Sequence, residues 1–301
     1  MERLILGTAA YKIFCGDAAA DRLSHAYMLY FQDGANLRGA LKLFALKYFG
    51  AEISSREGKL ILSEGLPDLK VYPAPDKKLN VDAASEIVAD ASVKPLEYDK
   101  KLYIISNFEG ASPVFQNKLL KVLEEPPAGV CFLLGTTSLS PVLPTVISRV
   151  KTLEIPLFTA QQIFAALERA GHNPLNLSAA EACGGNLGAA QQMLSGGWYA
   201  QTVKAAEEIC AADTVAKATG AAFRYGDFKY KKELLSQMQR IYFAQLKNYA
   251  KDENFKGVHS KAAVSFAVEA VNSALTDLVF NANFSSLLYS LLLRIAQKNG
   301  E

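Results

Sequence analysis

Short apolar runs alternate with amphipathic stretches along the first half of the chain. The run at 26–31 suits a buried strand, and after a glycine-containing loop the apolar residues of 37–49 recur at helical spacing. The same signals predict further strands within 65–73 and at 102–105, 130–134 and 150–155. They predict helices at 81–93 and 113–125. Strands and helices in alternation favour an α/β fold, in which helices cover both faces of a parallel sheet.

The strand signals stop beyond Pro156, and only helical patterns follow. Residues 157–200 resemble short helices broken at glycines, whereas residues 201–301 carry longer amphipathic helices. We therefore expect an α/β domain over 1–156, a small helical lid domain over 157–200 and an all-α domain over 201–301.

The composition is that of an ordinary globular protein. Of the 301 residues, 50% are hydrophobic and 21% are charged, and the net charge of +2 does not commit the whole chain to nucleic acid. The 4 cysteines are scattered without metal-binding spacing, which favours a reducing compartment. No apolar run approaches the roughly 18–20 residues that span a bilayer, so we expect a cytoplasmic protein without a membrane partner.

Compared with a phosphate-binding loop, the loop after the first strand is degenerate, and by itself it is typical of a plain turn between a strand and a helix. A P-loop needs a lysine for the β and γ phosphates and a hydroxyl for magnesium. If the motif runs from Phe31 to Arg38, Leu37 takes the place of the lysine and Arg38 that of the hydroxyl. A second register uses the spacing of Gly34 and Gly39, but it lacks the lysine too.

The second element of a nucleotide site is an acidic residue at the end of an apolar strand, where it holds magnesium. Here the strand at 102–105 is followed by Ser106 and Asn107, and Glu109 comes three residues late. A serine does not replace a carboxylate as a ligand for a hard cation. We therefore expect no magnesium at this position.

Three segments that occur in order and at suitable separations resemble the clamp-loader branch of the AAA+ family. These segments are 24–27 (SHAY), 119–127 (LLKVLEEPP) and 143–149 (LPTVISR). A fourth, 65–69 (GLPDL), is similar to the family's Gly-x-His-Pro-Asp-Leu. The resemblance is strong over 20–157 and implies a P-loop NTPase-like sheet domain followed by a lid and an oligomerising helical collar.

Two departures from the family pattern concern its cofactors. The family's zinc module would require four cysteines after the first helix, but none lies between Cys15 and Cys131, so we expect no zinc. Catalytic relatives carry a sensor arginine at the start of a lid helix, where this chain has Gly188. Together with the missing lysine and acidic residue, this implies a subunit without bound nucleotide and without ATP hydrolysis.

The pair Ser148-Arg149 keeps its family pattern, although Val150 replaces the cysteine that follows in relatives. The resemblance implies that Arg149, supported by Ser148, acts as an arginine finger on ATP bound by the neighbouring subunit. A guanidinium stabilises the charge that develops on a transferred phosphate. The alternative from the residues alone is a surface arginine paired with a carboxylate such as Glu154.

The helix at 113–125 has a polar N-terminal part that could face DNA phosphates in an assembled loader, or only solvent. Its candidate DNA-facing residues are Ser112, Gln116, Asn117 and Lys118.

The resemblance also implies the partners of the chain. These would be gamma/tau-type motor subunits, a delta subunit, the sliding clamp and primed DNA. Two alternatives stay open: an active ATPase whose unorthodox loop uses Lys42 or Arg38, and a delta-type, clamp-opening subunit that would not need Arg149.

Overall fold

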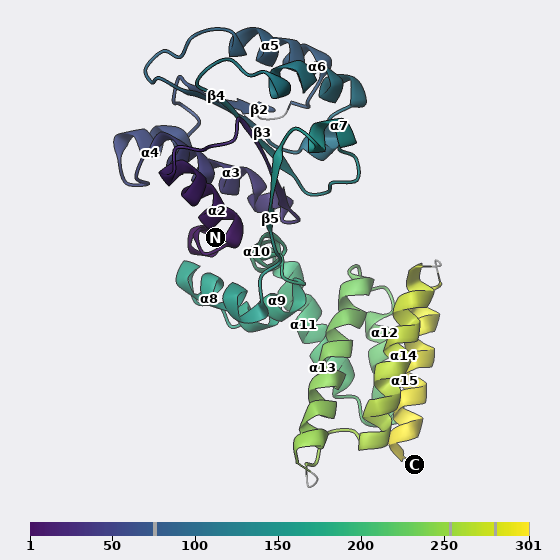
Figure 1. The fold of residues 1–301 in the computed structure, drawn as a ribbon. Coiled ribbons are helices and arrows are strands. Elements are labelled where there is room, and N and C mark those ends of the chain that lie inside the picture. The colour runs from purple at the N-terminus through teal and green to yellow at the C-terminus, as the bar shows by residue number, and fades with distance from the viewer. Residues whose placement is uncertain (75–76, 253–254, 280–281, 301) are drawn as a thin grey trace. The chain divides into compact units, whose positions relative to one another are not determined.

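The computed structural model describes residues 1–74, 77–252, 255–279 and 282–300. The chain divides into two compact units, Met1–Gln192 and Met193–Glu301, which are coloured from purple to yellow in Figure 1. The first unit contains the sheet and the second contains only helices. The finer division predicted at residues 156 and 200 stays a prediction.

Five parallel strands form the sheet of the first unit, in the order β2-β3-β4-β1-β5. The strands are β1 (Ala26–Phe31), β2 (Leu69–Tyr72), β3 (Lys101–Ile105), β4 (Val130–Thr136) and β5 (Lys151–Ile155). The predicted α/β class with a parallel sheet is therefore confirmed. Since β1 lies between β4 and β5, the loop after β1 meets the end of β4.

The helices of the first unit include several short ones that the sequence pattern did not predict. They are α1 (Glu2–Leu6), α2 (Ala9–Ala19), α3 (Gly34–Phe49), α4 (Arg56–Leu62), α5 (Val81–Ala91), the 3₁₀ turn η1 (Phe108–Gly110), α6 (Pro113–Glu124), α7 (Pro144–Ile147), α8 (Ala160–Ala170), α9 (Asn176–Ala182) and the first residues of α10 (Leu187–Ser195), whose last three residues belong to the second unit. Polar side chains fix where the longer ones begin: Asn80 caps α5, and Ser112 caps α6 ahead of Pro113.

Helices cover both faces of the sheet, as predicted (Figure 1). Alternate strand residues point to opposite faces. On one face Met28, Tyr103 and Phe132 pack with residues of α5, α6 and α7 in a single apolar cluster. On the other face Tyr27 contacts the ring of Phe14 from α2, at 4.9 Å between ring centroids.

The second unit is a helical bundle, consistent with the helical pattern of 201–301. Its helices are α11 (Gly197–Cys210), α12 (Val215–Tyr225), α13 (Lys231–Lys251), α14 (Lys261–Val279) and α15 (Phe284–Gly300). Their apolar faces share one buried core, which includes Leu234, Tyr242, Val271, Leu288 and Ile295. Within the ranges that the structure describes, no helix is both long and apolar enough to span a membrane.

A buried carboxylate ties the start of β2 to a distant loop in the first unit. Asp68 is fully buried and accepts hydrogen bonds from the backbone N–H groups of Leu96, Glu97 and Tyr98, at 2.6–2.8 Å. Burial alone raises the pKa of Asp68, but these three donors hold that pKa below its ordinary value. The ionised carboxylate therefore stabilises the fold.

We predict that Asp68→Asn lowers the free energy of unfolding by about 2–3 kcal/mol, because all three N–H groups lose a charged acceptor and at least one is left without any acceptor. The native pKa of Asp68 is depressed, so its contribution to stability is present above the unfolded-state pKa of about 3.9 and is lost as pH falls below it. Urea unfolding followed by circular dichroism at pH 3 to 7 measures both effects. The exposed neighbour Asp99, changed to Asn, is the control, and equal stability of the two variants at pH 7 would contradict the prediction.

Candidate functional site

Three loops meet where β1, β3 and β4 end, because the strands are parallel neighbours. They contain Asp33 after β1, Glu109 after β3 and Thr137 after β4. The loops are in close contact: a Cβ built on Gly34 would lie 3.3 Å from the Thr137 methyl carbon. In parallel α/β folds, ligands bind at this edge of the sheet.

Asp33 places a carboxylate at the N-terminus of α3, and its side chain is 1% exposed. Its Oδ1 accepts from the backbone N–H of Asn36 at 3.2 Å, and its Oδ2 accepts from the Asn36 amide and from the backbone N–H of Gly188, both at 2.8 Å. In a P-loop protein, a helix N-terminus in this position binds phosphate. Here the chain supplies the anion itself, which the helix dipole also favours.

Gly188, at the start of α10, lies directly on this loop. A Cβ at Gly188 would come within 2.4 Å of the Asp33 Oδ1 and 2.7 Å of the Ala35 Cβ, so a larger side chain has no room. The position where catalytic relatives carry a sensor arginine is thus filled by backbone contact with the loop. The sequence identified the glycine, and the structure gives the steric reason for it.

The side chains in the lysine and hydroxyl places of the motif turn away from the loop. Leu37 is fully buried against β4, where a Cβ on Gly135 would lie 3.2 Å from its Cδ1. Arg38 binds both oxygens of Glu64, at 2.7 and 2.5 Å, and Lys42 binds the same carboxylate at 2.7 Å. The hydrogen bonds from Arg38 and from Lys42 lower the pKa of Glu64 to about 2, against the opposing effect of burial.

The polar side chains that follow β3 take part in contacts within the protein or lie at its surface. Ser106 is buried and its hydroxyl donates to a carbonyl oxygen of β2 at 3.1 Å, while Asn107 is exposed with a left-handed φ of 56°. The Glu109 carboxylate accepts from the Thr136 hydroxyl at 3.1 Å and from the Thr137 hydroxyl and N–H at 2.7 and 3.2 Å. Glu109 thus joins the ends of β3 and β4.

These residues do not fit a nucleotide phosphate with its magnesium ion. Asp33 would repel the phosphate, and the backbone of Gly188 packs directly against the loop. The nearby cations Arg38 and Lys42 form ion pairs with Glu64. In the parts of the chain that the structure describes, no three His, Cys, Asp or Glu side chains are grouped so that they could hold a metal ion.

Arg149 lies in the turn between α7 and β5, and its side chain is 31% exposed. One edge of its guanidinium is held locally, since Nη1 donates to the Thr145 carbonyl at 2.8 Å and to the Ser148 hydroxyl at 3.2 Å. The other edge binds Glu124 at the end of α6, with Nε 2.6 Å from Oε1 and Nη2 on the same oxygen. Arg149 therefore does pair with a carboxylate, but the carboxylate is that of Glu124 and not that of Glu154.

The prediction that Gln116 faces DNA is wrong. Its side chain is fully buried, and its amide donates to the carbonyl oxygens of Ala111 and Pro141 at 3.0 Å and accepts from the N–H of Leu143 at 2.8 Å. All three partners are backbone groups, so Gln116 fixes the loop that leads to α7.

The other candidates on α6 lie at the surface. Ser112 uses its hydroxyl as the cap of the helix, at 3.2 Å from the N–H of Phe115. Asn117 and Lys118 are exposed, and the Lys118 amine contacts the hydroxyl of Ser85 on α5. Their role toward DNA stays a prediction.

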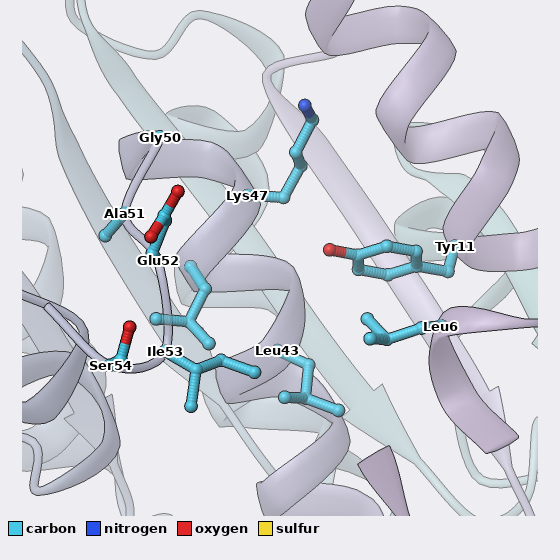
Figure 2. Close-up of a pocket in the computed structure, with 10 residues that line it drawn as sticks. Leu6, Tyr11, Leu43, Lys47, Gly50, Ala51, Glu52, Ile53 and Ser54 are labelled. Atoms are coloured by element: carbon cyan, nitrogen blue, oxygen red, sulfur yellow. The ribbon is translucent and has the colours of Figure 1, made fainter. Parts of the chain in front are cut away.

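A separate cavity of about 550 Å³ opens at the far end of α3, away from the closed loop. Figure 2 shows Leu6, Tyr11, Leu43 and Ile53 around it, with Lys47 beside them. Burial, with the nearby Cys15 thiol, raises the pKa of Tyr11 to about 12. The sequence pattern did not reveal this cavity, because α1 and α2, which form one wall, were not predicted.

The strand order, and the loop that leads from β1 into α3, define a P-loop NTPase-like domain of the AAA+ type. A family model described as "DNA polymerase III, delta subunit" matches residues 7–159, slightly more than half of the chain. The chain therefore belongs to that family. The resemblance drawn from its sequence segments is confirmed at this level.

Known relatives carry related names. The DNA polymerase III subunit delta' of Bacillus subtilis (strain 168) is 38% identical over 152 residues, which cover 47% of this chain and 45% of that protein. The DNA polymerase III subunit gamma of Buchnera aphidicola is 32% identical over 91 residues, 30% of this chain and 25% of that protein. The matched segments thus span less than half of either relative.

Among solved structures, a DNA polymerase III, gamma subunit-related protein from Thermotoga maritima aligns over 95% of this chain and 99% of its own. The sequence identity is 16% and the TM-score is 0.40.

We predict that Asp33→Ala loosens the contact between α10 and the loop. The change removes the helix cap and leaves the Gly188 N–H without its acceptor, so it should cost about 1–3 kcal/mol of stability. Hydrogen exchange read by mass spectrometry over the start of α10 should become at least about tenfold faster. The exposed neighbour Gln32, changed to Ala, is the control. Unchanged exchange at α10 in the Asp33 variant would show that the carboxylate does not hold this contact.

Proposed function

We propose that the chain is a non-hydrolysing, delta-prime-type subunit of a bacterial replicative clamp loader. The observation that carries the proposal is the Asp33 carboxylate, which caps the N-terminus of α3, where a P-loop protein binds phosphate, and accepts from the N–H of Gly188. A site whose anion is part of the chain has no use for ATP. Membership of the DNA polymerase III delta subunit family supports the same assignment.

In this proposal the chain assembles in the cytoplasm with gamma/tau-type motor subunits and a delta subunit. The relatives named as DNA polymerase III subunits delta' and gamma support this set of partners. The helical second unit would join the collar, and the complex would open the sliding clamp and load it on primed DNA. The chain itself would have no ATPase activity and would contain no zinc.

Arg149 would act on the ATP of a neighbouring motor subunit. Its exposure and its position on a turn held by Thr145 and Ser148 allow the guanidinium to reach outward from the domain. A guanidinium binds phosphate oxygens through two parallel N–H groups and stabilises the charge that develops during phosphoryl transfer. An arginine finger of this kind contributes about 10³–10⁵-fold in rate.

The alternative of an active ATPase with an unorthodox loop depends on Arg38 or Lys42. Both cations are bound by Glu64, and Arg38 also donates to the carbonyl of Pro73 at 2.7 Å. Neither is directed at the N-terminus of α3, so this alternative has little support from the geometry.

The isolated chain should not bind nucleotide. We expect isothermal titration calorimetry with Mg·ATP to give no measurable binding up to about 1 mM, because Asp33 and the phosphates would compete for the same donors. A motor subunit from the same loader is the positive control. Micromolar affinity that depends on magnesium would favour the active ATPase instead.

Arg149→Ala should remove hydrolysis at the single ATP site next to this chain. In a reconstituted loader with clamp and primed DNA, turnover at that site should fall about 10³-fold or more. The pre-steady-state burst of phosphate release should then lose the amplitude of one site. Arg22→Ala, which changes an exposed arginine of the same unit, should leave the burst intact. A full burst from the Arg149 variant would support the delta-type alternative.

A further inference from the structure

The guanidinium of Arg149 is bound on one side by neutral groups and on the other side by a carboxylate. Nη1 is held by neutral groups of its own turn, the Thr145 carbonyl and the Ser148 hydroxyl. The edge formed by Nε and Nη2 is bound by the carboxylate of Glu124. This second edge carries the pair of parallel N–H groups with which arginine binds phosphate. In the free chain, a carboxylate therefore occupies the edge that would bind the nucleotide.

The place of Glu124 in α6 makes it a ready partner for a cation. It is the last residue of the helix, where the partial negative charge of the helix end disfavours a carboxylate. The guanidinium of Arg149 offsets this unfavourable position. The next residue, Glu125, is also exposed, but it forms no ion pair with any residue that the structure describes.

The ion pair between Arg149 and Glu124 is nevertheless weak enough for another anion to displace the carboxylate. The side chains of Arg149 and Glu124 are 31% and 46% exposed, and exposed ion pairs are screened by water and salt. A terminal phosphate of ATP carries more negative charge than a carboxylate and offers three oxygens. It can thus replace Glu124 at Nε and Nη2, while Thr145 and Ser148 continue to hold Nη1.

We propose that Glu124 is a positioning residue that holds the phosphate-binding edge of Arg149 in the free chain and yields it to ATP on the neighbouring subunit. This inference rests on the proposed trans-acting role of Arg149. Glu124 competes with the phosphate for the same two N–H groups, so it sets how tightly the neighbour's ATP is bound. It does not contribute to the rate of the chemical step.

The test is Glu124→Gln in the reconstituted loader with clamp and primed DNA. Loss of the competing charge should lower the KM for ATP about 1.5- to 5-fold, with kcat within about twofold of the wild type. The difference in KM should shrink in 0.5 M salt, where the ion pair is screened. Glu125→Gln, which removes a neighbouring carboxylate of the same charge, should leave KM unchanged.

A second comparison shows whether Glu124 acts through Arg149. ATP affinity of the assembled loader is measured for Glu124→Gln, Arg149→Ala and the double variant. The Glu124 change should tighten ATP binding only when Arg149 is present. An unchanged or raised KM, a tenfold loss of kcat, or the same tightening without Arg149 would each overturn the inference.

The two proposals fail in different ways. If Arg149→Ala leaves the burst of phosphate release intact, the trans-acting role itself is wrong. If Arg149→Ala removes one site but Glu124→Gln leaves KM unchanged, only the role of Glu124 is wrong. Because Glu124 lies at the surface, thermal unfolding of the variant is expected to match the wild type within about 0.5 kcal/mol of stability.

Discussion

The carboxylate of Asp33 sits at the N-terminus of α3, where it satisfies the orphan N–H group of Asn36 and that of Gly188 in α10. A helix start of this kind needs an acceptor, and in a P-loop it is phosphate that accepts. Under the proposed function, this carboxylate accepts in place of a phosphate, so a lysine that binds phosphates is not needed. Leu37 can then pack under β4, and α10 can rest directly on the loop.

Much of the first unit could be predicted from the sequence because β1, β3 and β4 are apolar runs, and α3, α5 and α6 have apolar residues at helical spacing. The short helices α1 and α4 escaped prediction, since five and seven residues give too little periodicity. Gln116 was misjudged for another reason. A polar residue at an apparently exposed helical position can be buried when backbone groups from a distant loop satisfy its amide.

Only part of the candidate site could be predicted from the sequence. The departures from nucleotide-binding motifs at Leu37, Ser106 and Gly188 were recognised, but the contacts that surround these positions were not. Asp33 had a local signal, because an acidic residue before a helix and an Asn three residues later fit a helix cap. Glu124 had no local signal as the partner of Arg149. The two are 25 residues apart in sequence and meet only because β4 and α7 bring the chain back to the end of α6.

Asp33 and Glu124 are both carboxylates bound by groups that can also bind phosphate, a helix N-terminus and a guanidinium, and burial decides how readily each carboxylate can be displaced. Asp33 is 1% exposed and its partners are backbone N–H groups, so releasing it would leave those donors unsatisfied inside the protein. Glu124 is 46% exposed, and water can take its place at little cost. Asp33 is therefore a fixed part of its loop, whereas Glu124 can be displaced by a competing anion. Under the proposed function, this difference in solvent access separates a loop that binds no nucleotide from an arginine that acts on the ATP of a neighbouring subunit.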